Sequence, residues 1–273
     1  MNNYVAPPIK WVGGKRQLLE EIVPRIPEHD TYYEPFLGGG AVFFALQPNK
    51  AVLSDYNYEL INLYRTIKTQ PQLLIENLRY YSNTEEDYYK ARDYDRDEFL
   101  YQSMCPVQKA ARFLYLNKTG FNGLYRVNKK GHFNVPYGKN KDRRFLDEEN
   151  IMKCHKVLKS NDISVTASDF TRASDANKND FVYFDPPYVP LSITSSFTSY
   201  TKTGFGMKEQ KRLLQLCDTL NSRGVKWMLS NSSAPIVYTM YNAYNIIEVN
   251  ASRNVAASSS SRKRVKEVLV TNN

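Results

Sequence analysis

Short apolar runs that stop at an acidic residue recur along the chain and predict the strands of a sheet. The runs AVLS, DISVTAS and FVYF are followed at once by Asp55, Asp169 and Asp185. Runs of four to eight apolar, β-branched or aromatic residues are typical of buried strands, and such strands occur in α/β proteins. Further strands are predicted at 32–36, 226–230, 245–249 and 264–272.

Amphipathic segments between these strands predict helices. The segment 15–23 follows the Gly-Gly of KWVGGK and should end before Pro24, and the segment 41–47 follows the glycine turn LGGG. The helix predicted at 56–68 follows Asp55 directly. The order of strand, glycine turn, helix, strand and acid is typical of the start of a doubly wound nucleotide-binding sheet. Near the other end, MKEQKRLLQLCDTLNSRG predicts a helix capped by Gly224.

The alternating pattern breaks off after this start and resumes near residue 160. Helical stretches are predicted at 71–81, 85–99 and 107–118, and GLYRVNKKGHFNVPYG predicts a β-hairpin with its turn at Lys130 and Gly131. We therefore expect an α/β fold in which residues 59–159 form an inserted, mostly helical module. Residues 1–58 and 160–273 would form the main domain.

Composition narrows the class of partner. The 273 residues are 42% hydrophobic and 24% charged, which indicates a globular chain, and no apolar run is long enough to span a membrane. We therefore expect a cytoplasmic protein. A net charge of +9 favours a polyanionic partner such as nucleic acid. The scattered cysteines and histidines predict neither a metal site nor disulfides (Cys105, Cys154, Cys217, His29, His132, His155).

Two strand ends carry candidate chemistry. Asp185 begins the sequence DPPY, and two prolines cannot continue a sheet ladder, so a rigid turn would hold this carboxylate where ligands bind α/β sheets. From these residues alone, Asp-Pro-Pro as a simple strand terminator is about as probable. Asp55 lies where an acid often binds ribose hydroxyls, although it would equally serve as a helix N-cap.

The motifs together resemble one enzyme family. KWVGGK, EPFLGGG, SDYN, the insert with FNGLYRVNKKGHFNVPYG, then DPPY and LSNSS stand in the order found in the Dam family of N6-adenine DNA methyltransferases. The resemblance is strongest to the DpnM-like members of the D12 class, or alpha group, and extends over nearly the whole chain. It implies a Rossmann-like sheet with helices on both faces that uses S-adenosylmethionine, and an insert that recognises double-stranded DNA.

The resemblance also implies which residues bind the cofactor. Lys15 would pair with the methionine carboxylate, Asp55 would bind the ribose hydroxyls, and Asp169 would lie near the cofactor adenine, although Asp169 is as readily a loop acid. The full implied set comprises Trp11, Lys15, Phe36, Gly38, Gly40, Asp55, Asp169 and Asp185.

Catalysis in such a family falls to the DPPY turn. The Asp185 carboxylate and the Pro186 carbonyl would accept the two N–H groups of the target amine, and Tyr188 would stack on an extruded adenine. The methyl group would pass in line to nitrogen, without a metal ion. Tyr188 packed on Pro187 as an ordinary loop residue is the alternative.

The DNA contacts follow from the same resemblance. Arg126 would make a bidentate contact with guanine, although a phosphate contact is the commoner role for such an arginine. Phe121 would wedge into the base stack beside the target, where some relatives carry tyrosine. The remaining contacts would come from Lys10 to the first guanine, Asn122 to the opened base pair, and Leu124 and Pro136 to the thymine methyl group, with Phe197 or Tyr200 as loop contacts.

The sequence thus predicts methylation of the N6 amine of adenine in duplex GATC. A cognate restriction endonuclease would be a functional partner rather than a physical one. Two alternatives remain open at this point: an amino methyltransferase with another site or with cytosine N4 as acceptor, and a non-catalytic DNA-binding regulator that keeps the fold.

Overall fold

The structure is a computed structural model that describes residues 4–140, 144–160, 162–191, 204–252 and 264–272. Phe197 and Tyr200, expected as loop contacts, lie outside the described residues. The chain divides into two compact units. Unit 1 comprises 1–14, 38–47 and 57–167, and unit 2 comprises 15–37, 48–56 and 168–273. Among the described residues, no helix is long and apolar enough to cross a membrane.

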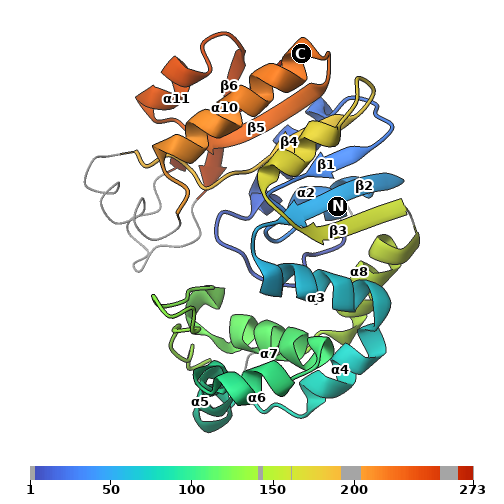
Figure 1. Cartoon of the computed structure of the whole chain (residues 1–273), viewed down its shortest axis with the longest axis vertical. Helices are drawn as coiled ribbons and strands as arrows, with labels where there is room; N and C mark the ends of the chain where they lie inside the picture. The colour runs from blue at the N-terminus through green and yellow to red at the C-terminus, as the bar shows by residue number, and fades with distance from the viewer. Residues whose placement is uncertain (1–3, 141–143, 161, 192–203, 253–263, 273) are drawn as a thin grey trace. The chain divides into compact units, whose positions relative to one another are not determined.

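A seven-stranded sheet with the order β3-β2-β1-β4-β5-β7-β6 is the framework of the fold (Figure 1). Strand β1 pairs in parallel with β2 and β4, and β4 pairs in parallel with β5, whereas β7 is antiparallel to both of its neighbours. This mixed, mostly parallel α/β sheet confirms the predicted fold class. The strands are β1 Tyr32–Glu34, β2 Lys50–Asp55, β3 Asp162–Ala167, β4 Phe181–Phe184, β5 Lys226–Ser232, β6 Asn245–Ser252 and β7 Arg264–Thr271.

Strand β4 is buried on both faces, as its uninterrupted apolar sequence predicts. Its neighbours β1 and β5 run parallel to it, so the carboxyl ends of all three strands lie at one edge of the sheet. Around β4 and β5 lies an apolar core that includes the fully buried Trp227 and Tyr241. This core fixes the strand ends from which the polar residues of unit 2 project.

The helices of unit 2 differ in part from expectation. The segment predicted as one helix at 15–23 is a 3₁₀ turn, η1 Lys15–Gln17, then α1 Leu19–Ile22 and a second 3₁₀ turn, η2 Val23–Arg25. Pro24 lies inside η2, because proline is tolerated in the first turn of a helix. Helix α10 Met207–Ser222 is capped by Gly224 with φ +72°, as predicted. The sequence did not predict η5 Phe170–Asp175 or α11 Pro235–Met240.

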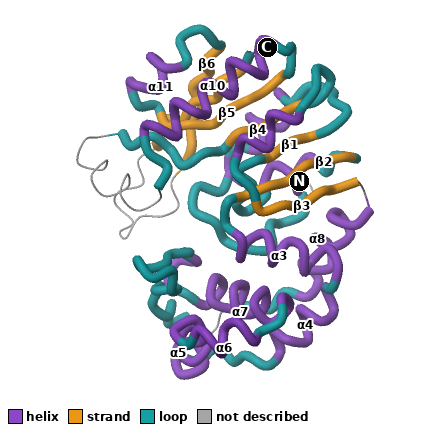
Figure 2. Tube along the Cα trace, in the orientation of Figure 1, coloured by secondary structure: helices purple, strands orange, loops and turns teal. Residues whose placement is uncertain are grey.

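Unit 1 is mostly helical (Figure 2). The segment predicted as one helix at 85–99 is broken at η3 Tyr94–Arg96, because Asp97 leaves helical geometry and caps the next helix instead. Helix α8 was not predicted. The elements are α2 Ala41–Leu46, α3 Tyr58–Thr69, α4 Pro71–Arg79, α5 Glu85–Asp93, α6 Glu98–Ser103, α7 Pro106–Thr119, η4 Phe121–Gly123 and α8 Glu148–Ser160.

The predicted hairpin is present at residues 126–134, with less regular pairing than a ladder. Val127 and Phe133 form an isolated antiparallel bridge, and the Asn128 amide donates to the His132 carbonyl. The turn closes where the Gly131 amide donates to the Asn128 carbonyl, and Gly131 has a φ of +82°. A left-handed residue after such a turn favours glycine, which explains the Lys130-Gly131 signal. We call residues 126–134 the β-hairpin of unit 1.

Candidate active site

The residues expected from sequence fall into two groups, one in each unit. Unit 2 holds the DPPY turn together with Lys15, Phe36, Asp55 and Asp169, and unit 1 holds the remainder. Each group is described within its own unit.

The DPPY turn is held from two sides. Beyond β4, the Val189 amide donates to Asn231 Oδ1 at 3.0 Å, and the Val189 carbonyl accepts from Ser232 Oγ. On the α10 side, Gln210 Nε2 donates to the Pro187 carbonyl at 2.9 Å. These buried contacts replace the ladder hydrogen bonds that the two prolines cannot make. The turn is therefore fixed with Asp185 at the carboxyl end of a central strand.

Asp185 forms an ion pair with Lys15. The distance from Lys15 Nζ to Asp185 Oδ1 is 2.8 Å, and the two side chains are 5% and 20% exposed. Burial raises the pKa of the Asp185 carboxyl above its usual value, and the Lys15 ammonium opposes that rise. Lys15 thus favours the ionised carboxylate, the form that accepts hydrogen bonds without donating one.

Tyr188 lies against the same ammonium group. Lys15 Nζ is 4.7 Å from the centre of the Tyr188 ring, and the Tyr188 hydroxyl donates to Glu267 Oε2 at 2.7 Å. Burial raises the pKa of Tyr188 well above its usual value, and the charges of Asp185 and Glu267 add to this effect. The phenol therefore stays protonated, and its hydrogen bond to Glu267 of β7 fixes the position of the hydroxyl end of the side chain.

A cluster of three aromatic rings, Phe36, Phe170 and Phe205, lies elsewhere in unit 2. The Phe36 ring stacks on Phe170 with 5.4 Å between ring centres, and Phe205 meets both rings edge-on. Asp55 ends β2, and its carbonyl accepts from the Ser168 amide. Phe36, Asp55 and Phe170 follow the ends of β1, β2 and β3, so they lie along one edge of the sheet, and Phe205 joins them from the segment before α10.

Asp169 already has partners within unit 2. Its Oδ1 accepts from the Thr171 amide at 3.0 Å, which caps η5, and from Arg212 Nη2 at 3.2 Å. Although partial burial works against ionisation, the hydrogen bonds from Thr171 and the Arg212 guanidinium hold the pKa of Asp169 below its usual value. Asp169 therefore has the contacts of a capping acid at the strand edge.

In unit 1, Trp11 packs over the glycine turn. Gly38 has a φ of +46°, and a Cβ atom there would lie 2.7 Å from Trp11 Cδ1. Gly40, with φ +67°, precedes α2. The Trp11 ring stacks on Tyr125 at 5.7 Å. The turn therefore needs glycine at Gly38 both for its backbone conformation and for the close approach of the indole.

Gly38→Ala is expected to destabilise the protein more than Gly131→Ala does. Both substitutions put a side chain in the left-handed region, which costs about 1–2 kcal/mol, but only Gly38 lacks space, since nothing lies within 4 Å of a Cβ on Gly131. The displaced Trp11 should add about 1–3 kcal/mol for Gly38→Ala. Urea denaturation of the two variants measures the difference, and equal losses would contradict the packing role of Trp11.

Lys10 lies beside the loop that contains Phe121 and Asn122. Buried Asn117 accepts from the Lys10 amide at 3.0 Å and donates to the carbonyls of Lys10 and Gly123. A Cβ atom on Gly123 would lie 2.8 Å from Lys10 Cβ. The structure therefore places Lys10 beside the loop that carries Phe121 and Asn122, more than a hundred residues later in the sequence. The Phe121 side chain is 49% exposed.

The other expected DNA contacts lie on or beside the β-hairpin of unit 1. Arg126 is exposed, and its guanidinium donates from Nε to Asn134 Oδ1 at 2.7 Å and from Nη2 to the Asn134 carbonyl at 2.9 Å. Leu124 is half-buried and Pro136 is exposed. The Pro136 carbonyl accepts from the Phe121 amide, which joins the two ends of this segment.

Several residues of these sites gave little signal in the sequence. Glu267 stands as an acid inside an apolar strand, which was a usable sign, and Asn231 belongs to the LSNSS motif. Gln210 and Asn117 look like ordinary helix residues, and only the fold brings them to their partners.

A mostly parallel α/β sheet with an Asp-Pro-Pro-Tyr turn at the carboxyl end of a central strand is consistent with a Rossmann-like methyltransferase fold. The chain matches the family model for D12 class N6 adenine-specific DNA methyltransferases over residues 11–255. It therefore belongs to that family and is an adenine-specific DNA methyltransferase.

Relatives agree with this assignment. The chain is 48% identical over 267 residues to "Type II methyltransferase M1.LlaDCHI" of Lactococcus lactis subsp. cremoris, with 96% of this chain and 94% of the relative covered. It is 39% identical to "Type II methyltransferase M.MjaIII" of Methanocaldococcus jannaschii, over 98% and 99% of the two chains. It is 34% identical to "DNA adenine methylase" of Escherichia coli (strain K12), over 96% and 93%.

Proposed function

We propose that the protein transfers the methyl group of S-adenosylmethionine to the N6 amine of adenine in duplex GATC, after the base has been flipped out of the helix. The observation that carries the proposal is the DPPY turn, in which a partly buried carboxylate and a braced peptide lie together at a strand end. The choice of GATC rests on the ordered motifs shared with the Dam family.

The residues of the expected cofactor site fit a nucleoside that carries an amino acid. Gly38 lets the backbone of the glycine turn approach the Trp11 indole closely, Phe36 offers an aromatic surface, and Asp55 ends β2 where ribose hydroxyls are commonly bound. When bound, the cofactor supplies an electrophilic methyl group. Lys15 has three N–H donors, so it can bind the methionine carboxylate and keep its ion pair with Asp185. Gly40 and Asp169 complete the proposed set.

The acceptor amine needs activation because its lone pair is delocalised into the adenine ring. In the proposed mechanism the Asp185 carboxylate and the Pro186 carbonyl each accept one N–H of the amine, which localises the lone pair on nitrogen and stabilises the developing positive charge. Tyr188 stacks on the flipped base. The braces from Asn231 and Gln210 support this role, since fixed acceptors require no reorganisation during transfer.

Unit 1 would recognise the DNA. Arg126 is proposed to contact guanine and Lys10 to contact the first guanine of the site, with Phe121 wedged into the base stack. Asn122 would stabilise the opened pair, and Leu124 and Pro136 would contact the thymine methyl group. The exposure of Phe121 and Arg126 and the tie between Lys10 and Gly123 support these roles. In functional terms, residues 59–159 form the proposed target-recognition domain, and residues 1–58 and 160–273 form the catalytic domain.

We place this activity in the cytoplasm, where bacterial and archaeal DNA lies. We further propose a cognate restriction endonuclease as a functional, not physical, partner.

The proposal is tested by expressing the protein in a bacterial host that lacks adenine methylation, then mapping methylated bases over the whole chromosome. We expect N6-methyladenine at GATC alone, and none with Asp185→Ala. Modification at another sequence would overturn the GATC assignment, and N4-methylcytosine would overturn the proposed acceptor.

A further inference from the structure

The guanidinium of Arg126 is held in a fixed orientation by a single residue across the β-hairpin of unit 1. Asn134 accepts from Arg126 Nε through its side-chain oxygen at 2.7 Å and from Nη2 through its carbonyl at 2.9 Å, and the Asn134 amide donates to the Arg126 carbonyl at 2.9 Å. Three hydrogen bonds thus join one pair of residues. An exposed arginine that is held in this way loses most of its rotational freedom.

The donors that Asn134 takes are those on one side of the guanidinium. Of the five N–H groups of arginine, those of Nε and one of Nη2 point to Asn134, so the terminal edge formed by Nη1 and Nη2 is left to face a ligand. Two parallel N–H groups on one edge are what bidentate recognition of guanine O6 and N7 requires. Asn134 therefore selects the edge that can read a base.

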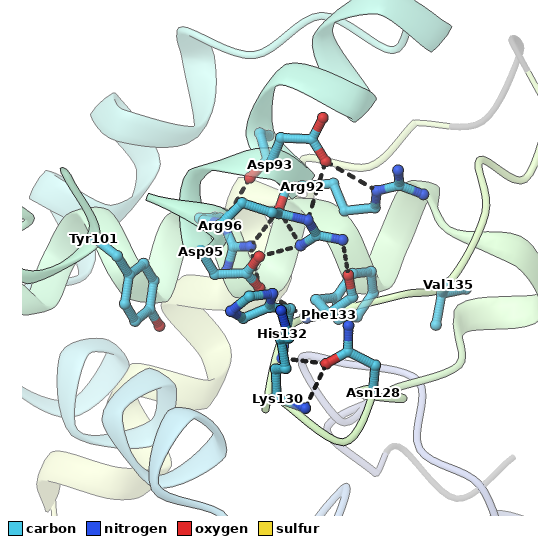
Figure 3. A network of polar contacts seen from close by, with 12 residues as sticks. Arg92, Asp93, Asp95, Arg96, Tyr101, Asn128, Lys130, His132, Phe133 and Val135 are labelled. Atoms are coloured by element: carbon cyan, nitrogen blue, oxygen red, sulfur yellow. Dashed lines mark hydrogen bonds and ion pairs between the residues drawn. The ribbon is translucent and has the colours of Figure 1, made fainter. Parts of the chain in front are cut away.

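The hairpin is in turn fastened to the helical part of unit 1 by Asp95 (Figure 3). Asp95 Oδ2 accepts from the Phe133 amide at 2.7 Å and pairs with Arg112 Nη2 at 2.8 Å, and Oδ1 binds Arg96. Arg96 Nη2 also donates to the Phe133 carbonyl at 2.6 Å. Both backbone groups of the residue next to Asn134 are therefore held by side chains of η3.

Arg112 anchors this network to α7. It is 1% exposed, its Nε donates to the Ala91 carbonyl at 2.6 Å, and its Nη1 lies 3.9 Å from Glu59 Oε1. Glu59 in turn accepts from the hydroxyl groups of Tyr101 and Tyr125. Removal of the Asp95 charge would leave a buried guanidinium without its nearest counter-ion, which is costly. The hairpin is thus attached through a rigid, charged contact.

We propose that Asn134 and Asp95 are positioning residues for Arg126: Asn134 orients the guanidinium, and Asp95 fixes the strand of the hairpin that carries Asn134. The inference rests on the proposed role of Arg126 in base reading. It assigns sequence discrimination to two residues that need not touch DNA.

The experiment measures discrimination with Asn134→Ala and Asp95→Asn, each alone and combined with Arg126→Ala. Discrimination is the ratio of kcat/KM on GATC to kcat/KM on duplexes in which one G·C pair of the site is replaced by A·T. Glu86→Gln is the matched control, because Glu86 is an acid of α5 in the same unit that is 77% exposed and pairs with Lys90, outside the Asp95 network.

We expect Arg126→Ala and Asn134→Ala each to lower the ratio by roughly tenfold, and Asp95→Asn to lower it severalfold. Neither Asn134→Ala nor Asp95→Asn should lower it further in the Arg126→Ala background, because residues that act through one contact are not additive. Glu86→Gln should stay within about twofold of the unsubstituted protein, as expected for a surface ion pair.

Hydrogen exchange gives a second measurement for Asp95→Asn. If Asp95→Asn does not fold, Asn134→Ala alone tests the inference. Exchange should become faster over residues 126–134 and stay unchanged over α7. An unchanged ratio in folded Asn134→Ala, or an equal loss with and without Arg126, would overturn the inference. The unsubstituted protein tests the proposed function separately. If it prefers a site other than GATC, the discrimination ratio is measured on that site. If it shows no site preference, both base reading by Arg126 and the positioning of Arg126 are overturned.

Discussion

Asp185→Asn is expected to lower kcat by roughly 10²–10³-fold, the usual loss when one preorganised group that stabilises developing charge is removed. The amide keeps the shape of the side chain, but it cannot offer a charged acceptor to the amine. Affinity for S-adenosylmethionine should change much less than kcat, because the other proposed cofactor residues remain. Single-turnover methyl transfer and a cofactor titration measure the two effects.

The matched control is Asp175→Asn, an exposed acid of η5 whose ion pair is with Arg172. Asp185→Asn also leaves the nearly buried Lys15 without its counter-ion, so thermal melting must show that the variant is folded. A folded Asp185→Asn protein with a kcat within a fewfold of the unsubstituted enzyme would contradict the role of this carboxylate.

Lys15→Met is expected to move the acidic limb of the pH profile of kcat/KM to higher pH. Burial raises the pKa of Asp185, and the Lys15 ammonium is the charge that opposes this rise. Removal of the ammonium therefore raises the pKa further. The proposed mechanism requires the ionised carboxylate, so activity is lost as the pH falls through this pKa. The variant should therefore lose activity at a higher pH than the unsubstituted protein and regain it as the pH rises.

The direction in which the acidic limb moves distinguishes two roles of Lys15, binding the cofactor carboxylate and lowering the pKa of Asp185. If Lys15 only bound the cofactor carboxylate, Lys15→Met would raise KM for S-adenosylmethionine and leave the acidic limb in place. If Lys15 lowers the pKa of Asp185, the kcat/KM of Lys15→Met for DNA, measured at saturating S-adenosylmethionine, should recover at higher pH. An unchanged acidic limb would contradict this electrostatic role. Lys50→Met, at the start of β2 and exposed, is the control.

The strands were predictable because each carries a strong local signal. The buried run 181–184 and the acid that follows it specified both a central strand and its end, and the glycine C-cap specified the end of α10. The helical breaks were not predictable in the same way. At η3 the helix breaks because Asp97 leaves helical geometry and caps α6; α8 is amphipathic and packs against α3 and α4, but it was not predicted.

The candidate site was predictable as far as its residues stand in motifs. DPPY, KWVGGK and EPFLGGG are contiguous, so a sequence pattern identifies them, although their roles rest on the family resemblance. The partners of these motifs are not contiguous: Glu267 reaches Tyr188 from β7, and Gln210 reaches the Pro187 carbonyl from α10. The close ion pair of Lys15 with Asp185 was also not foreseen. Such contacts depend on how the elements pack, which residue spacing does not contain.

The most direct test of the central claim is the transfer of labelled methyl from S-adenosylmethionine to purified duplexes of equal composition, one with GATC and the others with the same four bases permuted. We expect label on the adenine of GATC alone, and none with Asp185→Ala. Equal label on the permuted duplexes would contradict the site, and undiminished label with Asp185→Ala would contradict the mechanism.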